Sequence, residues 1–168
     1  MKLHEEVLRI RELLGEEKEQ KIFRVPGLDF FHEDPREAWQ ILQKVLEQRG
    51  NPPYSIGGDL YLRGLAIKSL GDLTSVGGSL DLAYTSIKSL GNLTSVGGYL
   101  DLRDTTIESL GNLTSVGGWL VLRNTPIESL GNLTSVGDTL NLRDTPLSRK
   151  YTEEQIRQMV DVGGKIYM

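Results

Sequence analysis

Aromatic, arginine and aspartate side chains recur along this chain at intervals of twenty residues. Tyr99 and Trp119 occupy equivalent positions twenty residues apart, and Arg103 and Arg123 do the same. Aromatic residues and arginine are enriched among the residues that contribute most to protein–protein affinity. A guanidinium group can also hold a carboxylate or a phosphate through two parallel hydrogen bonds. The residue types therefore favour a binding surface, provided that the fold brings equivalent positions together.

Carboxylates at equivalent positions are the pattern that an acid–base pair or a cation site would need. Asp81 and Asp101 are such a pair, but the next equivalent positions hold Tyr61 and Val121, so no third acidic ligand joins them. We interpret the two aspartates as exposed, solvated charges.

The chain lacks the residues of several catalytic classes. It contains no cysteine, which excludes disulfides, thiolate catalysis and cysteine-based zinc sites. His4 and His32 are its two histidines, and both precede the repeats, so a nucleophile–histidine–acid arrangement on the repeats is excluded. We predict a protein that is not an enzyme, with no cofactor and no metal.

The equivalent positions belong to a tandem repeat. Four units of twenty residues start at Gly58, Gly78, Gly98 and Gly118, and a degraded fifth unit starts at Asp138. A fixed period of this length is the signature of a solenoid, in which each unit stacks on the next.

Within a unit, Leu-x-Leu alternates as a half-buried strand does. Leu100 and Leu102 are predicted to point inward, and Tyr99, Asp101 and Arg103 outward. Further inward positions then recur every three residues, which fits short 3₁₀-like turns; they are Thr105, Ile107, Leu110, Leu113 and Val116. The double glycines that open each unit suit a tight corner with positive φ.

Two segments flank the repeats. Residues 1–52 are predicted to form a helical N-terminal cap or small domain, with helices over 3–14 and from Asp34-Pro35 to about Gly50, and an extended piece over 21–25 between them. Residues 53–147 form the solenoid. Residues 148–168 form a C-terminal cap with a short helix that begins at the capping box Thr152–Gln155, and a last short strand over 165–168.

The pattern Leu80-x-Leu82-x-x-Thr85-x-Ile87-x-x-Leu90-x-x-Leu93 resembles the leucine-rich repeat. The resemblance implies an α/β solenoid, right-handed, with one parallel β-sheet and a threonine column in place of the asparagine ladder of that family. The threonines are Thr85, Thr105, Thr125 and Thr145, and Leu65 interrupts the column. The Val-Gly-Gly-x-Leu-x-Leu signature is also similar to short-repeat proteins of bacteria and phages. Bacterial effectors with twenty-residue repeats carry a cysteine ligase domain, and that activity does not transfer to a chain without cysteine.

The outward face of the predicted sheet is the candidate site. Its predicted partner-binding residues are Tyr61, Tyr99, Asp101, Arg103, Trp119, Val121, Arg123, Asn141 and Arg143. Two other interpretations stay open at this point. The aromatic rings could cover the sheet or pack on the C-terminal segment, and the arginines could be neutralised locally by Asp81, Asp101, Asp104 and Asp144.

The net charge of −4, from 19 basic and 23 acidic residues, bears on the partner. It argues against a protein built to hold nucleic acid. We predict non-catalytic binding of a protein partner with an acidic or mixed surface. The alternatives are nucleic-acid binding through the arginines with stacking on Tyr99 and Trp119, and an enzyme with its chemistry in residues 1–52. The sequence also bears on where the protein acts. Without a signal peptide or an apolar stretch long enough to cross a bilayer, we expect no membrane association and a cytoplasmic location, in a bacterium or a phage-infected host cell.

By analogy, such a protein would act as an inhibitor or adaptor of a host or defence factor.

Overall fold

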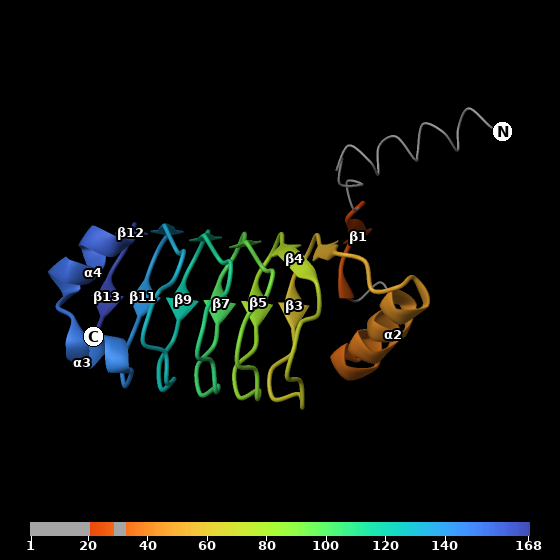
Figure 1. Cartoon of the computed structure of the whole chain (residues 1–168), viewed down its shortest axis with the longest axis horizontal. Coiled ribbons are helices and arrows are strands. Elements are labelled where there is room, and N and C mark those ends of the chain that lie inside the picture. Colours follow the sequence, from red (N-terminus) through yellow and green to blue (C-terminus); the bar gives the residue numbers. More distant parts are fainter. Residues whose placement is uncertain (1–20, 29–32) are drawn as a thin grey trace, which may run out of the picture.

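Each twenty-residue repeat forms one rung of a solenoid in the computed structural model, which describes residues 21–28 and 33–168. In a typical rung, β8 (Ser115–Val116) leads through Gly117 and Gly118 into β9 (Leu120–Val121). A turn and a loop then lead to the first strand of the next rung. The rungs follow one another along the long axis of the molecule (Figure 1).

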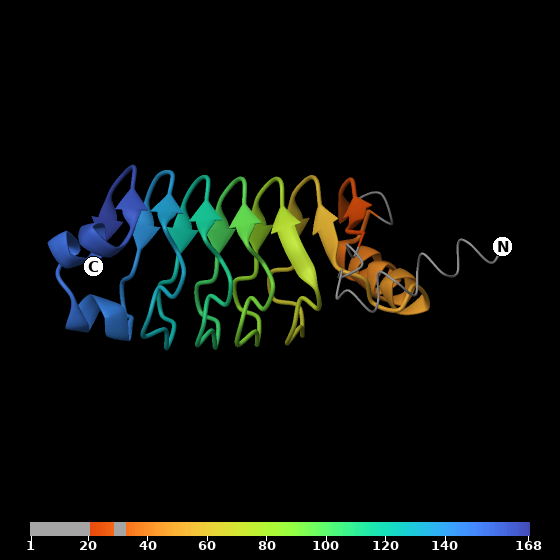
Figure 2. The same cartoon turned by 45° about the horizontal axis from the view of Figure 1, so that its top comes forward.

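The strands form two parallel sheets, seen as two rows of arrows in Figure 2. Within the described residues, sheet A contains in spatial order β1 (Phe23–Val25), β2 (Tyr54–Ile56), β4 (Leu73–Val76), β6 (Ser95–Val96), β8, β10 (Ser135–Val136) and β12 (Asp161–Val162). Over the same part of the chain, sheet B contains β3 (Leu60–Tyr61), β5 (Leu80–Asp81), β7 (Leu100–Asp101), β9, β11 (Leu140–Asn141) and β13 (Ile166–Tyr167).

The leucines that open the strands of sheet B form one buried column, as the sequence predicts. Leu100 is paired with Leu80 on one side and with Leu120 on the other, in parallel register. Its side chain is fully buried, as are the side chains of Leu102 and Ile107 in the same rung. The prediction of stacked repeats around a leucine core is therefore confirmed.

The expectation of a single sheet is wrong. The Ser-Val dipeptides that we expected in 3₁₀-like turns form the strands of sheet A instead, because the backbone after each valine pairs with the rung before it. Gly97 N, for example, donates to Val76 O at 2.9 Å. The three-residue spacing reflects the inward positions Leu110, Leu113 and Val116, all of which are buried. The repeats are therefore mostly β, and helices lie at the two ends of the stack (Figure 1).

The double glycines have a different role from the predicted one. They are absent from the described glycines with positive φ; Gly91 and Gly111, in the Leu-Gly-Asn turns, adopt that conformation. A Cβ atom on Gly97 would instead lie 2.1 Å from the carbonyl oxygen of Gly77, and one on Gly117 would lie 2.1 Å from Gly97 O. The corner needs glycine because successive rungs approach too closely for a side chain.

The threonine column within the predicted leucine-rich pattern also acts differently. The Thr105 hydroxyl is buried and donates to Leu102 O of its own rung at 2.7 Å, so it closes a turn and does not join rungs. Another threonine column makes the bonds between rungs. Thr94 Oγ1 donates to Thr74 O at 2.9 Å, and Thr114 Oγ1 donates to Thr94 O at 3.0 Å.

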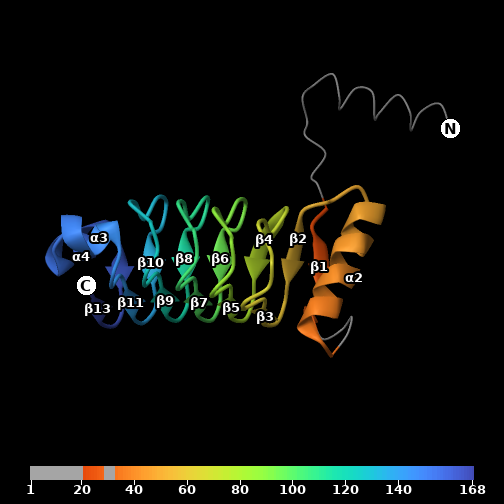
Figure 3. The same cartoon turned by 90° about the horizontal axis from the view of Figure 1, so that it is seen from below.

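Helix α2 (Pro35–Gln48) lies at the N-terminal end of the stack, beside β1 (Figure 3). It begins as predicted, because the Asp34 carboxylate accepts from the Arg36 amide at 2.8 Å. Its buried residues are Ala38, Trp39, Leu42 and Leu46, which belong to the same core as the repeats. The predicted helix over 3–14 lies outside the described residues.

The C-terminal end has two short helices, α3 (Pro146–Lys150) and α4 (Glu153–Met159). The predicted capping box is present, with reciprocal bonds between Thr152 and Gln155. After α4, β12 extends sheet A and β13 extends sheet B. The segment Asp161-Val162-Gly163-Gly164-Lys165-Ile166 thus repeats the Ser-Val-Gly-Gly-x-Leu pattern of the rungs before it.

Candidate partner-binding site

The outward face of sheet B collects most of the large exposed side chains of the repeats. The register aligns Tyr61, Asp81, Asp101, Val121, Asn141 and Tyr167 in one column, each about 4.8 Å from the next. Beside this column, Tyr99 and Trp119 are exposed as predicted. The fold therefore brings together the residues that the sequence places twenty apart.

Trp119 is the most exposed large apolar side chain of this face, at 56% of its maximal accessible surface. Its indole nevertheless has a fixed partner, because Trp119 Nε1 donates to Asp138 Oδ2 at 2.7 Å. Asp138 stands where the preceding rungs carry the second glycine of the corner. The one break in that glycine column thus supplies the acceptor for the one tryptophan of the repeats.

Tyr61 is held in a similar way at the other end of the face. Its hydroxyl donates to Asp59 Oδ2 at 2.8 Å, and Asp59 Oδ1 accepts from the Ser79 amide at 2.7 Å. The bond from Ser79, followed by that from Tyr61, lowers the pKa of the Asp59 carboxyl. The bond to Asp59 raises the pKa of the Tyr61 phenol, and the Tyr99 phenol adds to this shift.

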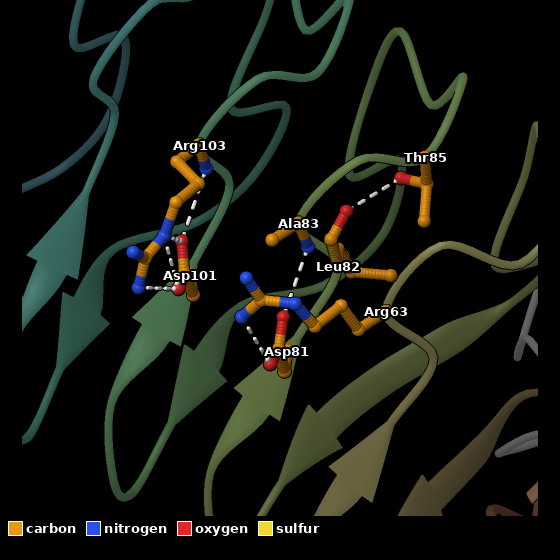
Figure 4. Close-up of polar contacts among 7 residues, drawn as sticks. All are labelled: Arg63, Asp81, Leu82, Ala83, Thr85, Asp101 and Arg103. Atoms are coloured by element: carbon orange, nitrogen blue, oxygen red, sulfur yellow. Dashed lines mark hydrogen bonds and ion pairs between the residues drawn. The ribbon is translucent and has the colours of Figure 1, made fainter.

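Asp81 and Asp101 are not the exposed, solvated charges that we expected. They are 8% and 3% exposed. Each carboxylate accepts a hydrogen bond from the backbone amide of the second residue after it. Asp81 accepts from Ala83 N at 3.0 Å, and Asp101 accepts from Arg103 N at 3.1 Å. Figure 4 shows that an arginine covers each one.

The arginine cover differs between the two aspartates. Arg103 Nε donates to both oxygens of Asp101, at 2.8 and 3.0 Å, and its Nη2 also bonds to Oδ2. Arg63 Nη1 lies 3.5 Å from Asp81 Oδ2. Asp101 raises the pKa of the Arg103 guanidinium through these hydrogen bonds. Burial removes water from the carboxylates, which is unfavourable. The contacts with backbone amides and arginines replace the lost hydration and offset this cost.

The other arginines of the face also have partners, one a carboxylate and one an aromatic ring. Arg123 Nε lies 3.5 Å from Asp144 Oδ2, in a pair whose two side chains are both more than half exposed. The Arg143 guanidinium lies over the Tyr167 ring, 4.5 Å from its centroid. The arginines therefore do not form a bare cationic stripe. Of the remaining predicted residues, Val121 and Asn141 are half-buried, and Asn141 Oδ1 accepts from Arg143 N at 3.2 Å.

Sequence reasoning missed Tyr84, Asp138 and Tyr167 as members of this face. Tyr84 is 53% exposed and adopts a left-handed φ of 59°. The equivalent positions hold residues that tolerate this conformation better, namely Gly64, Asp104, Asn124 and Asp144. A tyrosine at a position that otherwise holds Gly, Asp or Asn can be recognised in the sequence, and it indicates an exposed residue that the fold does not favour. The Arg63 guanidinium lies over its ring, 5.0 Å from the centroid.

The opposite face, on sheet A, is of another kind. It carries a shallow groove of about 650 Å³ along the stack, lined by the serines, valines and glycines of successive rungs. Neither face brings together three or more of the His, Cys, Asp or Glu residues that could hold a metal ion, among the residues described. No helix within 21–28 and 33–168 combines the length and the apolar character needed to cross a membrane.

No protein-family model, curated protein or solved structure matches this chain. The geometry of the sheet B face is therefore the basis for a functional proposal.

Proposed function

We propose that this protein is a non-catalytic recognition module that binds a protein partner through the outward face of sheet B. The observation that carries the proposal is Trp119, whose indole is largely exposed and yet fixed by Asp138. An exposed ring gains little for folding. A partner that covers it gains apolar burial without the entropic cost of ordering a free side chain.

The surroundings of Trp119 fit the centre of an interface. Val121, in β9, and Arg123, two residues after it, continue the alternation that begins at Trp119, so this rung presents an aromatic, an aliphatic and a cationic group in a row. Tyr99 is exposed on the neighbouring rung. Interfaces of moderate size commonly depend on such a cluster of a few aromatic and arginine side chains.

The charges of the face favour a partner with an acidic or mixed surface. Arg123 is the guanidinium most available to a partner, because its pair with Asp144 is exposed to water and contributes little stability. Arg103 is committed to a buried carboxylate. Binding would therefore use Arg123 as a donor to a partner carboxylate and leave the inner pairs intact.

The same contacts support a role other than catalysis. Asp81 and Asp101 are paired on neighbouring rungs of the face, but each accepts from a backbone amide and forms an ion pair with an arginine. Carboxylates engaged by these partners are not free to bind a substrate or a cation. The arginine partners and the net charge of −4 also weigh against nucleic acid as the ligand. The similarity of the repeat to short-repeat proteins of bacteria and phages suggests, by analogy alone, an inhibitor of a host or defence factor.

A site-specific crosslinking experiment tests the proposal. A photoreactive side chain at Tyr99 should capture a defined protein from a lysate of the native host, and Trp119→Ala should weaken binding of the purified partner by about 2 kcal/mol or more. Ser115→Ala is the matched control, because Ser115 lies on sheet A of the same rung, and it should bind as the unchanged protein does. Equal loss of binding in both variants would contradict the assignment to sheet B. Capture of nucleic acid, with affinity that falls steeply with salt, would favour that alternative instead.

A further inference from the structure

The loops that lead from sheet B back to sheet A form a row along the stack, and charged side chains lie along this row in a definite order (Figure 1). In four successive rungs, a buried isoleucine such as Ile107 has an exposed residue on each side of it. The residue after each isoleucine is charged. These four residues, named here the charge column, are in order Lys68, Lys88, Glu108 and Glu128.

The charge column is regular because the loops that carry it are alike. The serine after each charged residue accepts from the amide of the glycine two residues later, at 3.0 or 3.1 Å in all four loops. At the centre of the column, Glu108 N donates to Lys88 O at 2.9 Å, and Ser89 pairs with Ser109 in parallel register. Successive charged residues therefore lie one rung apart, about 4.8 Å at the backbone.

The order of these charges is unfavourable within a single copy of the chain. Lys88 Nζ lies 3.6 Å from Glu108 Oε1, and this is the one ion pair of the charge column in the part of the chain that the structure describes. Lys68 has a lysine as its neighbour in the column, and Glu128 has a glutamate. Like charges at facing positions of neighbouring strands repel. An alternating order would have given every lysine a glutamate on the adjacent rung, so the stack alone does not account for two blocks of opposite sign.

The order is complementary to its own reversal. If a second copy faces the column with its stack running in the opposite direction, Lys68 lies opposite Glu128 and Lys88 lies opposite Glu108. A twofold axis repeats both pairs, so every lysine of the column meets a glutamate of the other copy. Because the spacing between rungs is the same in both copies, this match holds over all four rungs at once.

The residues before the isoleucines fit the same arrangement. They are exposed and have small side chains, in the order Ala66, Ser86, Thr106 and Pro126. Reversal places Ala66 opposite Pro126 and Ser86 opposite Thr106, so small apolar groups meet each other and hydroxyl groups meet each other. Small side chains beside the charge column allow two copies to approach until the lysines and glutamates make contact.

We propose that two copies of this chain associate through the charge column and the small residues beside it, antiparallel and related by a twofold axis. A second copy is the occupant that the charges select, because it places four ion pairs between the copies and no like charges opposite each other. The contact covers four rungs of about 4.8 Å each, which is less than a standard interface, so the association is weak and reversible. The outward face of sheet B takes no part in it, so the inference is independent of the proposed function.

Sedimentation of the full chain tests this inference. The unchanged protein should show a monomer–dimer equilibrium at concentrations up to about 1 mM. Its dissociation constant should rise at least about tenfold from low salt to about 0.5 M salt, because exposed ion pairs are screened.

Charge reversal in two complementary variants makes the test specific. Lys68→Glu with Lys88→Glu leaves glutamates alone in the column, and Glu108→Lys with Glu128→Lys leaves lysines alone. Each variant should dimerise at least about a hundredfold more weakly than the unchanged protein, because every pair between the copies becomes repulsive. An equimolar mixture of the two variants should form a dimer that contains one copy of each. The variant with all four changes is complementary to itself again and should dimerise as the unchanged protein does.

Lys44→Glu with Lys165→Glu is the matched control. It makes the same change in net charge as Lys68→Glu with Lys88→Glu, at two exposed lysines outside the column, and it should dimerise as the unchanged protein does. An unchanged protein that stays monomeric over the whole concentration range would overturn the proposal and leave the column to solvent or to a different protein. A mixture of the two complementary variants that stays monomeric would overturn it too. Dimers that persist equally in both variants would have the same consequence, because a different face would then make the contact.

Discussion

The two faces of the solenoid share one backbone plan but differ in what the sequence does with it. On sheet A, successive rungs repeat Thr-Ser-Val-Gly almost without change. On sheet B, the first outward column reads Asp59, Ser79, Tyr99, Trp119, Thr139, with no residue used twice. Since both sheets stack with the same register, the variety on sheet B is not demanded by the fold. The constancy on sheet A has structural causes in the close glycine corners and in the threonine bonds between rungs.

The first way to break this comparison is to disturb a corner of sheet A. Gly117→Ala should lower the free energy of unfolding by about 3 kcal/mol or more, because its Cβ would lie 2.1 Å from the backbone oxygen of Gly97 and the rungs would have to separate. Urea denaturation measures the loss. Tyr99→Ala, on sheet B of the preceding rung, is the control and should change stability by less than about 0.5 kcal/mol. A Gly117→Ala protein of unchanged stability would show that the corners are not tightly packed.

The converse experiment removes the central ring of sheet B. Trp119→Ala should weaken partner binding by about 2 kcal/mol or more and change the unfolding free energy by less than about 0.5 kcal/mol. Calorimetric titration and urea denaturation measure the two quantities. Asp138→Gly restores the corner consensus and removes the acceptor of the indole, so it should reduce affinity by a smaller amount. A destabilised Trp119→Ala protein with intact binding would make the ring structural.

The arginines allow a finer comparison within sheet B. Arg103→Ala should lower the unfolding free energy by about 1–2 kcal/mol, because it leaves the buried Asp101 carboxylate without its guanidinium. The double replacement Arg103→Ala with Asp101→Ala should recover part of this loss, since no buried charge then remains. If Arg103→Ala alone is neutral in urea denaturation, water reaches Asp101 and the pair is not a structural element.

Replacing Tyr84, which has a left-handed backbone conformation, should change the free energy of unfolding by a smaller amount and in the opposite direction. Tyr84→Asn should raise the unfolding free energy by up to about 1 kcal/mol, because asparagine tolerates a φ of 59° better than an aromatic residue does. Thermal unfolding measures the change, and Asn124→Tyr is the reciprocal variant, which should lose stability. If Tyr84 belongs to the interface, the stabilised protein binds its partner less well, as happens where strain is kept for function. A less stable Tyr84→Asn protein would mean that the ring contact with Arg63 outweighs the backbone strain.

The sequence predicts the stack and its leucine column because a period of twenty residues repeats five times, so that each inward position is seen several times over. It does not reveal the second sheet, because two-residue strands such as Ser115–Val116 are too short to show alternation. The candidate face is predictable from Leu-x-Leu alternation, which places Tyr99 and Trp119 outside. The burial of Asp81 and Asp101 is not predictable in this way, because it depends on how the arginine side chains fold back over these carboxylates. Asp138 and the last rung, by contrast, were visible as a broken glycine column and as a fourth copy of Val-Gly-Gly.

The smallest expected effect comes from Arg123, and it separates affinity from stability most sharply. Its ion pair with Asp144 is exposed, so Arg123→Ala should change the unfolding free energy by less than about 0.5 kcal/mol, in contrast to Arg103→Ala. If a partner carboxylate takes the place of Asp144, the loss of affinity should be about 1 kcal/mol at low salt and should shrink as ionic strength rises, because exposed charges are screened over about 10 Å at 0.1 M. Asp144→Ala is the informative companion, since it frees the same guanidinium and should strengthen binding slightly. Titrations with the partner at two salt concentrations measure the affinity of the unchanged protein and of the two variants. Equal affinities for the three would show that the partner meets the ring of Trp119 without using the arginine beside it.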